Sequence, residues 1–482
     1  MKAAFIECWR VLRWLLLAVL LLALTLIAAL WWANRHDDPL RPEVAALLKF
    51  EPPSPEAMRG NGYFTMLVLG APAGEDAFEA GQRCFAAQMR GYERLQQTGK
   101  LEFASQNACE SPSVLLTPMR CDANAGNCAA HYVKHAEAIR QALDKHAALV
   151  QRYRQMMELP EYVEVIPPDF ANLPGYQNLV AASELWDMQA VLLLADGQTS
   201  EALHMLRQNA GLHRRMMNGA RTLLGGMLAV AMETRHQRAV NGLIRQWPKM
   251  AQQYVGELKA ALGETDAMGM IPALKGEMRF TLTTSSLLHI HLLFDDAPFE
   301  EQLRNFVLSP VVWTSYLPNA TLNQSYQNLQ TVIHLAHLPA DQLGPHAAEA
   351  AETAWKAVEG QGILPFRLRN FWGNIQVGIA GPGLYVPYIE RAHDVEAHRR
   401  LVQLQITALQ EHIPFDQMTA WLAAQPPELR NPYTLQPMGW DAAAQALIFE
   451  GRQPNTQNPE PRNVFRVPIG PVEAGAIANQ RQ

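Results

Sequence analysis

Charged residues are scarce in this chain. Its 482 residues include 40 Lys and Arg and 46 Asp and Glu, so 18% of the side chains are charged, against about 25% in an average soluble domain. The net charge of −6 lacks the basic surplus that binding to nucleic-acid phosphates requires. With 49% apolar residues, the composition is also unlike that of a disordered chain. We therefore expect a folded protein that does not bind nucleic acid.

Cysteine is equally scarce, and none of the five cysteines lies beyond residue 128. Apart from Cys8, all fall within 45 residues: Cys84, Cys109, Cys121 and Cys128. Their spacing lacks the short Cys pairs of zinc sites. An even, clustered set indicates two disulfides formed in an oxidising compartment. Of the three possible pairings we favour Cys121–Cys128 with Cys84–Cys109, because the turn-forming residues 122–127 can close a small loop.

Sequence motifs of several enzyme classes are missing. The chain has no G-x-S-x-G, H-E-x-x-H or Walker A motif, and no dinucleotide-binding fingerprint. The sequence therefore predicts no cofactor.

One long apolar run is present. Residues 14–33 carry no charge, and as a helix they would be about 30 Å long, the thickness of a bilayer core. A cleaved signal peptide would have a shorter apolar region and a small-residue cleavage site, whereas this run ends in bulky residues, Leu30, Trp31 and Trp32. We therefore expect a retained, single-pass transmembrane helix that contacts the lipid bilayer through residues 14–33.

The charges on either side of this run predict its orientation. Lys2, Arg10 and Arg13 precede it, whereas Arg35, Asp37 and Asp38 follow. Positive residues favour the cytoplasmic side, so residues 1–13 are expected in the cytoplasm. The rest of the chain would lie outside the bacterial cytoplasmic (inner) membrane, in the periplasm, where the expected disulfides can form.

The fold class expected from hydrophobic periodicity is mainly α, with an irregular array of helical hairpins after the transmembrane helix. A proline-rich stalk over 34–62 leads to a helical domain over 63–452. The clearest hairpin joins helices over 179–194 and 199–217 through a turn at Asp196-Gly197-Gln198. A polar tail over 453–482 is expected to be flexible.

Glycine and proline cluster over 360–387, which predicts a long ordered loop resembling a lid. A last long helix over 394–411, N-capped by Asp394, should follow it. Beyond that helix, turn and strand signals near 431–450 predict a small β-hairpin.

The run N-P-Y-T-L-Q-P-M-G-W-D over 431–441 resembles the D-P-[FY]-[ST]-G-x-P-[LF]-x-[YW] hairpin of single-pass, membrane-anchored helical bacterial proteins. Asn431 stands in place of the acidic residue and Leu435 in place of the glycine, so the turn need not be the same. The resemblance implies a hairpin and no particular activity. The matching positions are Asn431, Pro432, Tyr433, Thr434, Pro437 and Trp440.

Two sets of residues suggest catalytic chemistry. His291 and Asp295 share a helical face, but no third ligand joins them, so we predict no metal site and keep the two as candidate catalytic residues. Glu233 and Glu277 lie in apolar helical stretches, where paired carboxylates can perform general acid–base chemistry. The alternative is structural, because an arginine follows each glutamate by two residues and buried acids usually pair with cations.

A different kind of site is suggested by residues 364–372, L-P-F-R-L-R-N-F-W. Arginine and aromatic side chains in a loop are typical of contacts with lipid headgroups or a protein partner. The candidate binding residues are Arg367, Arg369, Phe371 and Trp372.

These observations favour a membrane-anchored helical binding or scaffold protein whose partners are other proteins of the cell envelope. The alternative is a periplasmic hydrolase acting on glycan or peptide through Glu233 and Glu277, with 360–387 as its lid.

Overall fold

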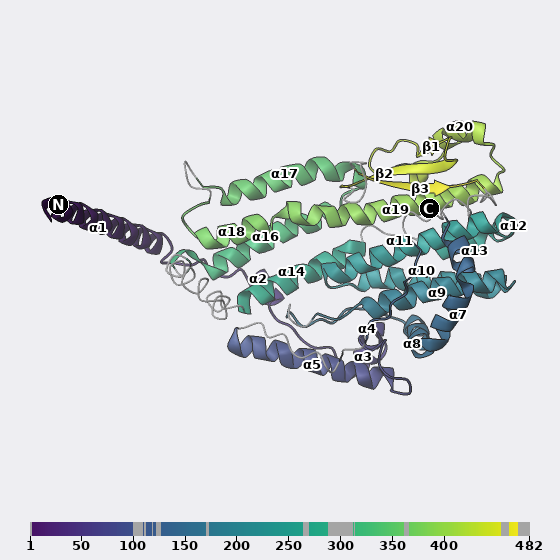
Figure 1. Cartoon of the computed structure of the whole chain (residues 1–482), viewed down its shortest axis with the longest axis horizontal. Helices are drawn as coiled ribbons and strands as arrows, with labels where there is room; N and C mark the ends of the chain where they lie inside the picture. Colours follow the sequence, from purple (N-terminus) through teal and green to yellow (C-terminus); the bar gives the residue numbers. More distant parts are fainter. Residues whose placement is uncertain are drawn as a thin grey trace.

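The computed structural model describes residues 2–99, 109, 112–117, 119–121, 127–169, 173–263, 269–287, 312, 314–360, 366–454 and 462–470. These residues form a mainly α-helical protein with one apolar N-terminal helix and a small antiparallel sheet near the C-terminal end, as the sequence predicted (Figure 1).

In the first half of the chain, the regular elements among the described residues are all helices. Its elements are α1 (Lys2–Ala33), α2 (Pro42–Leu47), α3 (Pro55–Arg59), α4 (Gly62–Met66), α5 (Ala77–Thr98), α6 (Cys128–Lys134), α7 (Ala136–Lys145), α8 (Ala147–Glu158), α9 (Gln177–Ala195), α10 (Thr199–Gly219) and α11 (Leu223–Gln246).

The second half adds more helices and then the sheet. Its elements are α12 (Pro248–Gln253), α13 (Val255–Leu262), α14 (Met270–Leu287), α16 (Pro318–Ala336), α17 (Ala340–Val358), α18 (Phe371–Ile379), α19 (Pro382–Gln410), α20 (Met418–Ala423), β1 (Gly439–Asp441), β2 (Ala446–Pro454) and β3 (Arg462–Pro468).

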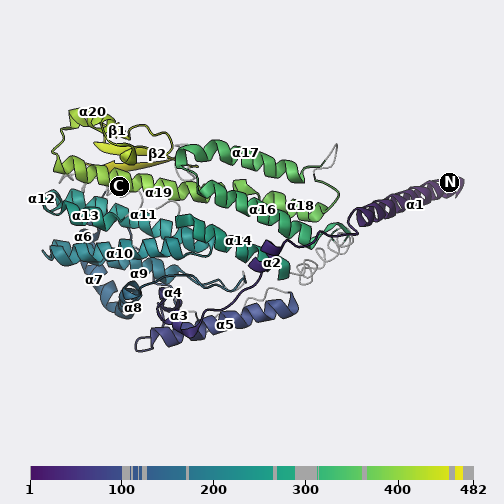
Figure 2. The same ribbon diagram turned by 180° about the vertical axis from the view of Figure 1, so that it is seen from behind.

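Helix α1 projects from one end of the body, and the sheet lies at the opposite end (Figures 1 and 2). Within α1, the stretch Trp9–Ala33 is long and apolar enough to cross a membrane and is not buried against the body. Trp31 and Trp32, in the last turn, are 58% and 63% exposed. Indole rings at the end of an apolar helix favour the membrane–water interface.

The proline-rich segment 34–62, which we expected to be a stalk, packs along the body. Val44 of α2 is fully buried in a cluster with Leu274 and Leu282 of α14. Farther on, the side chain of Asn61 donates to the carbonyl of Val163 at 2.7 Å and accepts from the Val163 N–H at 2.9 Å. Helix α1 is therefore joined to a segment that belongs to the folded body.

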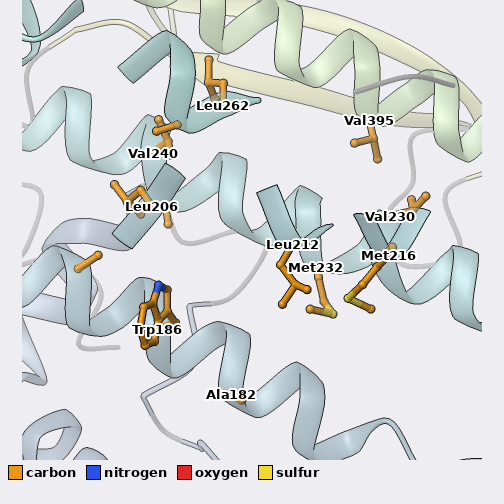
Figure 3. Packing of buried hydrophobic residues seen from close by; sticks show 14 of the residues in the cluster. Ala182, Trp186, Leu206, Leu212, Met216, Val230, Met232, Val240, Leu262 and Val395 are labelled. Atoms are coloured by element: carbon orange, nitrogen blue, oxygen red, sulfur yellow. The ribbon is translucent and has the colours of Figure 1, made fainter. Parts of the chain in front are cut away.

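The core of the body is built on the expected hairpin of α9 and α10, in which Trp186 Nε1 donates to the Met205 carbonyl at 3.0 Å. Gly197 closes the turn with φ +82°, a conformation that suits glycine. Figure 3 shows the apolar side chains that α9, α10, α11, α13 and α19 contribute to this core. Burial of these faces supplies most of the stability of such helices.

Two disulfides join the four clustered cysteines in the pairing favoured from the sequence. Cys84 pairs with Cys109, and Cys121 pairs with Cys128, with Cα–Cα distances of 5.2 and 5.4 Å. Both bridges are compatible with an oxidising compartment.

The expectation of a lid-like loop over 360–387 is wrong for most of that segment. Residues 371–379 form α18, and α19 begins at Pro382 instead of Asp394. Proline at the first helical position needs no N–H partner, so Pro382 starts the helix. Asp394 is consequently buried inside α19 and does not cap it.

The C-terminal sheet contains the predicted hairpin of β1 and β2, and it also contains β3. We expected the residues of β3 to belong to a flexible tail. Val467 of this strand is fully buried. The polar composition of residues 453–482 predicted a tail, although the strand itself contains apolar residues. The tail prediction is therefore wrong for residues 462–468, while residues 471–482 lie outside the described part of the chain.

The turn at 431–435 is held by side-chain and backbone contacts at both departures from the motif. The side chain of Asn431 accepts from the Tyr433 N–H at 2.9 Å, as an aspartate would. Leu435 adopts φ +59°, the left-handed conformation that a glycine would take without strain. Tyr433 then donates to Asp394 at 2.7 Å, which fixes the hairpin on α19.

Candidate functional site

A chain of buried polar side chains crosses the helical core. We call it the core network, and it links α8, α9, α10, α11 and α19 by direct hydrogen bonds between neighbouring side chains. Its members are Tyr153, Ser183, Asp187, Asn209, His213, Glu233, His236, Gln237 and His398.

Three members of the core network form a hydrogen-bonded series of hydroxyl, imidazole and carboxylate, as in serine hydrolases. Ser183 Oγ lies 2.9 Å from His213 Nε2, and His213 Nδ1 lies 3.0 Å from Glu233 Oε2. Burial alone would raise the pKa of Glu233, but the hydrogen bond from His213 and the nearby His236 lower it below its usual value. The geometry of hydroxyl, imidazole and carboxylate is that of a catalytic triad.

Access distinguishes this arrangement from a working triad. Ser183, His213 and Glu233 are 3%, 0% and 2% exposed, so a substrate cannot reach the hydroxyl without opening the core. Ser183 also lies inside α9, where backbone N–H groups bond within the helix and are not free to bind an oxyanion. We interpret the core network as a structural device that fixes how the helices pack.

His236 carries a positive charge within the core network. Its Nδ1 lies 2.8 Å from Asp187 Oδ1, and its Nε2 lies 2.8 Å from the Ala261 carbonyl. Both partners are acceptors, so both ring nitrogens carry a proton and the ring is cationic. Burial lowers the pKa of His236, yet Asp187, Glu233 and the Ala261 carbonyl outweigh burial and raise it to about 9.

Glu277 does not join Glu233. Its Oε2 accepts the backbone N–H of Leu223, the first residue of α11, at 2.9 Å. Glu233 lies ten residues farther along α11, about 15 Å at 1.5 Å per residue. Glycoside hydrolases hold their two carboxyl groups within about 5–9.5 Å, so the two glutamates are too far apart along the helix for this mechanism.

The position of Glu277 has a structural explanation. A second buried carboxylate, Glu164, accepts from the N–H groups of Arg221 and Thr222 at 2.8 and 3.1 Å at the same helix start. Burial raises the pKa of both glutamates, and the backbone donors partly offset that rise. Gly225 is required here, because a Cβ would overlap the Glu164 carboxylate. Glu277 therefore satisfies the first free N–H of α11, and Glu164 satisfies the N–H groups of the two residues just before the helix.

The other catalytic candidates, His291 and Asp295, lie outside the described residues. Within the described ranges, no three His, Cys, Asp or Glu side chains are grouped as a metal site requires.

The junction between α1 and the body is a second notable cluster, which we call the anchor joint: Asn34, Asp37, Asp38 and Asn370. Asn34 Nδ2 donates to the carbonyls of Leu30 and Leu368 at 2.7 and 3.2 Å, and its Oδ1 accepts the Asn370 N–H at 2.5 Å. The last turn of α1 is thus bonded directly to the loop before α18.

Asp37 completes the anchor joint by capping a body helix. Its carboxylate accepts the N–H groups of Asn319 and Ala320, in the first turn of α16, at 2.8 and 3.0 Å. The N-cap residue of α16 is Leu317, whose side chain cannot accept a hydrogen bond. Asp38 in turn accepts from Arg369 Nη2 at 2.7 Å. The segment that follows α1 is consequently bonded to the body at several points.

The four candidate binding residues divide into two pairs. Arg367 and Arg369 are exposed beside the anchor joint, whereas Phe371 and Trp372 are half-buried at the start of α18. Phe371 packs edge-on against Phe366, with ring centroids 6.0 Å apart.

An apolar corner lies farther along the body, between α17, α18 and α19. Trp355, Ile379 and Leu384 are 45%, 72% and 50% exposed there. They line one depression of about 150 Å³, together with small residues such as Ala351 and Gly381.

No family model matches this chain, and neither a curated protein nor a solved structure is significantly similar to it.

Sequence reasoning missed the core network and the anchor joint. Asp37 and Asp38 counted only as charges after the apolar run, and Ser183 and His213 stood singly in apolar helices. One signal was available: the helix start at Leu317-Pro318-Asn319 lacks a capping side chain, which implies an acceptor from elsewhere in the chain.

Proposed function

We propose that the chain is a membrane-anchored binding or scaffold protein, fixed in the bacterial cytoplasmic membrane by α1, whose body holds other envelope proteins in the periplasm. The observation that carries this proposal is the apolar corner of Trp355, Ile379 and Leu384. Exposed apolar side chains gathered around one depression are typical of protein contact sites.

The anchor joint supports the same function. A scaffold gains from presenting its binding surface at a fixed height and angle, because a partner in the same membrane then meets it without an ordering cost. The enclosed position of Glu233 and the contact of Glu277 with the start of α11 favour this proposal over a paired-carboxylate hydrolase.

Photo-crosslinking in intact cells tests this proposal. A photoreactive residue at Ile379 should give a discrete adduct of reproducible mass, and the adduct should weaken at least fivefold when Leu384→Glu is added. The same photoreactive residue at Leu435, 47% exposed in the turn before β1, is the control. Repeated failure to form a specific adduct at 379, or equal adducts at 379 and 435, would refute the proposal.

The mass of the adduct also identifies the kind of partner. An adduct of twice the chain mass means that a second copy binds the corner, which contradicts a scaffold for other proteins. Thermal unfolding of Leu384→Glu serves as a check that the variant folds.

A further inference from the structure

The loop that precedes α18 lies beside the end of α1 that joins the body. Asn34 follows the last residue of α1, and its side chain bonds to the carbonyl of Leu368. A hydrogen bond of 3.2 Å leaves no room for a gap between the end of the apolar helix and this loop. When α1 spans a bilayer, Trp31 and Trp32 lie at the membrane–water interface. The backbone of Leu368 then lies near that interface too, because it is hydrogen-bonded to Asn34 at the end of α1.

The exposed side chains of this loop suit a lipid surface. Leu368 is 45% exposed and has an arginine on each side. An apolar side chain between two cations is typical of interfacial contacts, in which the apolar group enters the headgroup region and the cations bind phosphates. We propose that Leu368 inserts among the lipid headgroups and that Arg367 and Arg369 bind the phosphates of anionic lipids.

Both guanidinium groups are positioned by the protein and keep donors for this role. Arg367 donates through Nε and Nη2 to the carbonyls of Glu359 and Lys356. Arg369 donates through Nη2 to Asp38 and to the His36 carbonyl. Each guanidinium has five N–H donors, so each can also donate to a phosphate oxygen. Their existing bonds orient both arginines in advance, which lowers the entropic cost of binding.

The consequence is a second point of membrane contact. A protein held by one transmembrane helix alone can tilt relative to the membrane plane. A loop that rests on the headgroups beside that helix resists this tilt. The body is thereby held upright, with the sheet at its far end (Figure 2). This inference rests on the membrane anchoring in the proposed function and is independent of any protein partner.

Depth measurement in nanodiscs tests the inference on the full-length chain. In a Cys8→Ser background, single cysteines replace Leu368, Leu435 or Leu24 and carry a bimane fluorophore. Leu435 is 47% exposed, close to the 45% of Leu368, and Leu24 of α1 is 54% exposed. The discs contain phosphatidylcholine and phosphatidylglycerol, with nitroxide on the headgroup or on the acyl chain.

Headgroup nitroxide should quench the label at 368 at least threefold more than the label at 435, and acyl-chain nitroxide should quench the label at 24. Equal quenching at 368 and 435 overturns the inference while the label at 24 still reports an anchored protein. A label at 24 that is not quenched overturns anchoring itself and the inference with it.

The phosphate contact is tested by Arg367→Gln, which leaves the ion pair of Arg369 and Asp38 in place. This change should reduce quenching at 368 about twofold in discs with phosphatidylglycerol. The control is Arg154→Gln, because Arg154 is 58% exposed and lies on α8. If both variants quench like the parent protein, the phosphate contact is refuted, and unfolding temperatures check that both variants are folded.

Discussion

At the scale of single residues, the structure holds a leucine in a left-handed conformation. Leu435 holds φ +59° in the turn that docks the C-terminal hairpin, with its side chain 47% exposed. The left-handed conformation costs a leucine about 1–2 kcal/mol. The turn is stable because Asn431, Tyr433 and Asp394 around it are bonded to each other.

Leu435→Gly should therefore raise the free energy of unfolding by up to about 1 kcal/mol, because relief of strain exceeds the added entropy of glycine in the unfolded chain. Leu224→Gly is the matched control, since Leu224 is also 47% exposed but lies in α11. The free energy of unfolding of this control variant should fall by about 1 kcal/mol. Thermal unfolding measures both, and equal destabilisation of the two variants would contradict the prediction.

At the scale of elements, the core network explains how helices of low charge pack in one arrangement. Apolar faces alone fit one another in several registers, but a buried hydrogen bond is satisfied in only one of them. His236 ties α11 to Asp187 of α9 and to the Ala261 carbonyl of α13. His398 of α19 reaches the same network through Gln237 at 2.8 Å.

The charge of His236 predicts how stability depends on pH. Its pKa is raised from 6.5 to about 9 in the folded state, so its contribution is full below pH 6.5 and is lost as pH rises through 9. With about 1.4 kcal/mol per pKa unit, the loss is about 3 kcal/mol. Burial and Arg238 lower the pKa of His398 to about 3. Since this value is below the unfolded pKa of 6.5, His398 lowers the stability of the fold as pH falls below 6.5.

His236→Gln removes this dependence. The difference in unfolding free energy between parent and variant should shrink between pH 6.5 and 9, as measured by denaturant unfolding. His204→Gln, on the exposed face of α10, is the control and should match the parent. A parent–variant difference that stays constant up to pH 9.5 would show that His236 is not charged in the folded protein.

At the scale of the whole molecule, the body has two distinct ends. The anchor joint and the exposed arginines surround the base of α1, and the sheet lies at the far end (Figure 1). One disulfide holds α5 through Cys84, and the other holds the start of α6 through Cys128. They join segments 25 and 7 residues apart in sequence.

Opening the longer loop, Cys84–Cys109, should cost about 3–4 kcal/mol, and opening Cys121–Cys128 about 2–3 kcal/mol, because the entropy of the unfolded chain rises with loop length. Paired Cys→Ser variants measured by thermal unfolding give the two values. Mass mapping without reductant is the direct check. Four free thiols in the native protein would contradict the pairing.

The sequence by itself determined the features that depend on local pattern and composition. The apolar run ending at Ala33, the hairpin of α9 and α10 and the β1–β2 hairpin each follow from residues close together in the chain. For the cysteines, the turn-forming residues 122–127 favoured one of three possible pairings. Helical periodicity, turn residues and short loop closure are local properties.

Tertiary structure decided everything that depends on partners distant in sequence. Pro382 starts a helix where glycine and proline content predicted a loop, and β3 forms because β2 offers it an edge. Asp37 caps a helix that begins some 280 residues later. Glu277 bonds to the start of α11, and Glu233 pairs with His213. The partner of a buried polar group is set by how the helices pack, and no local pattern records that choice.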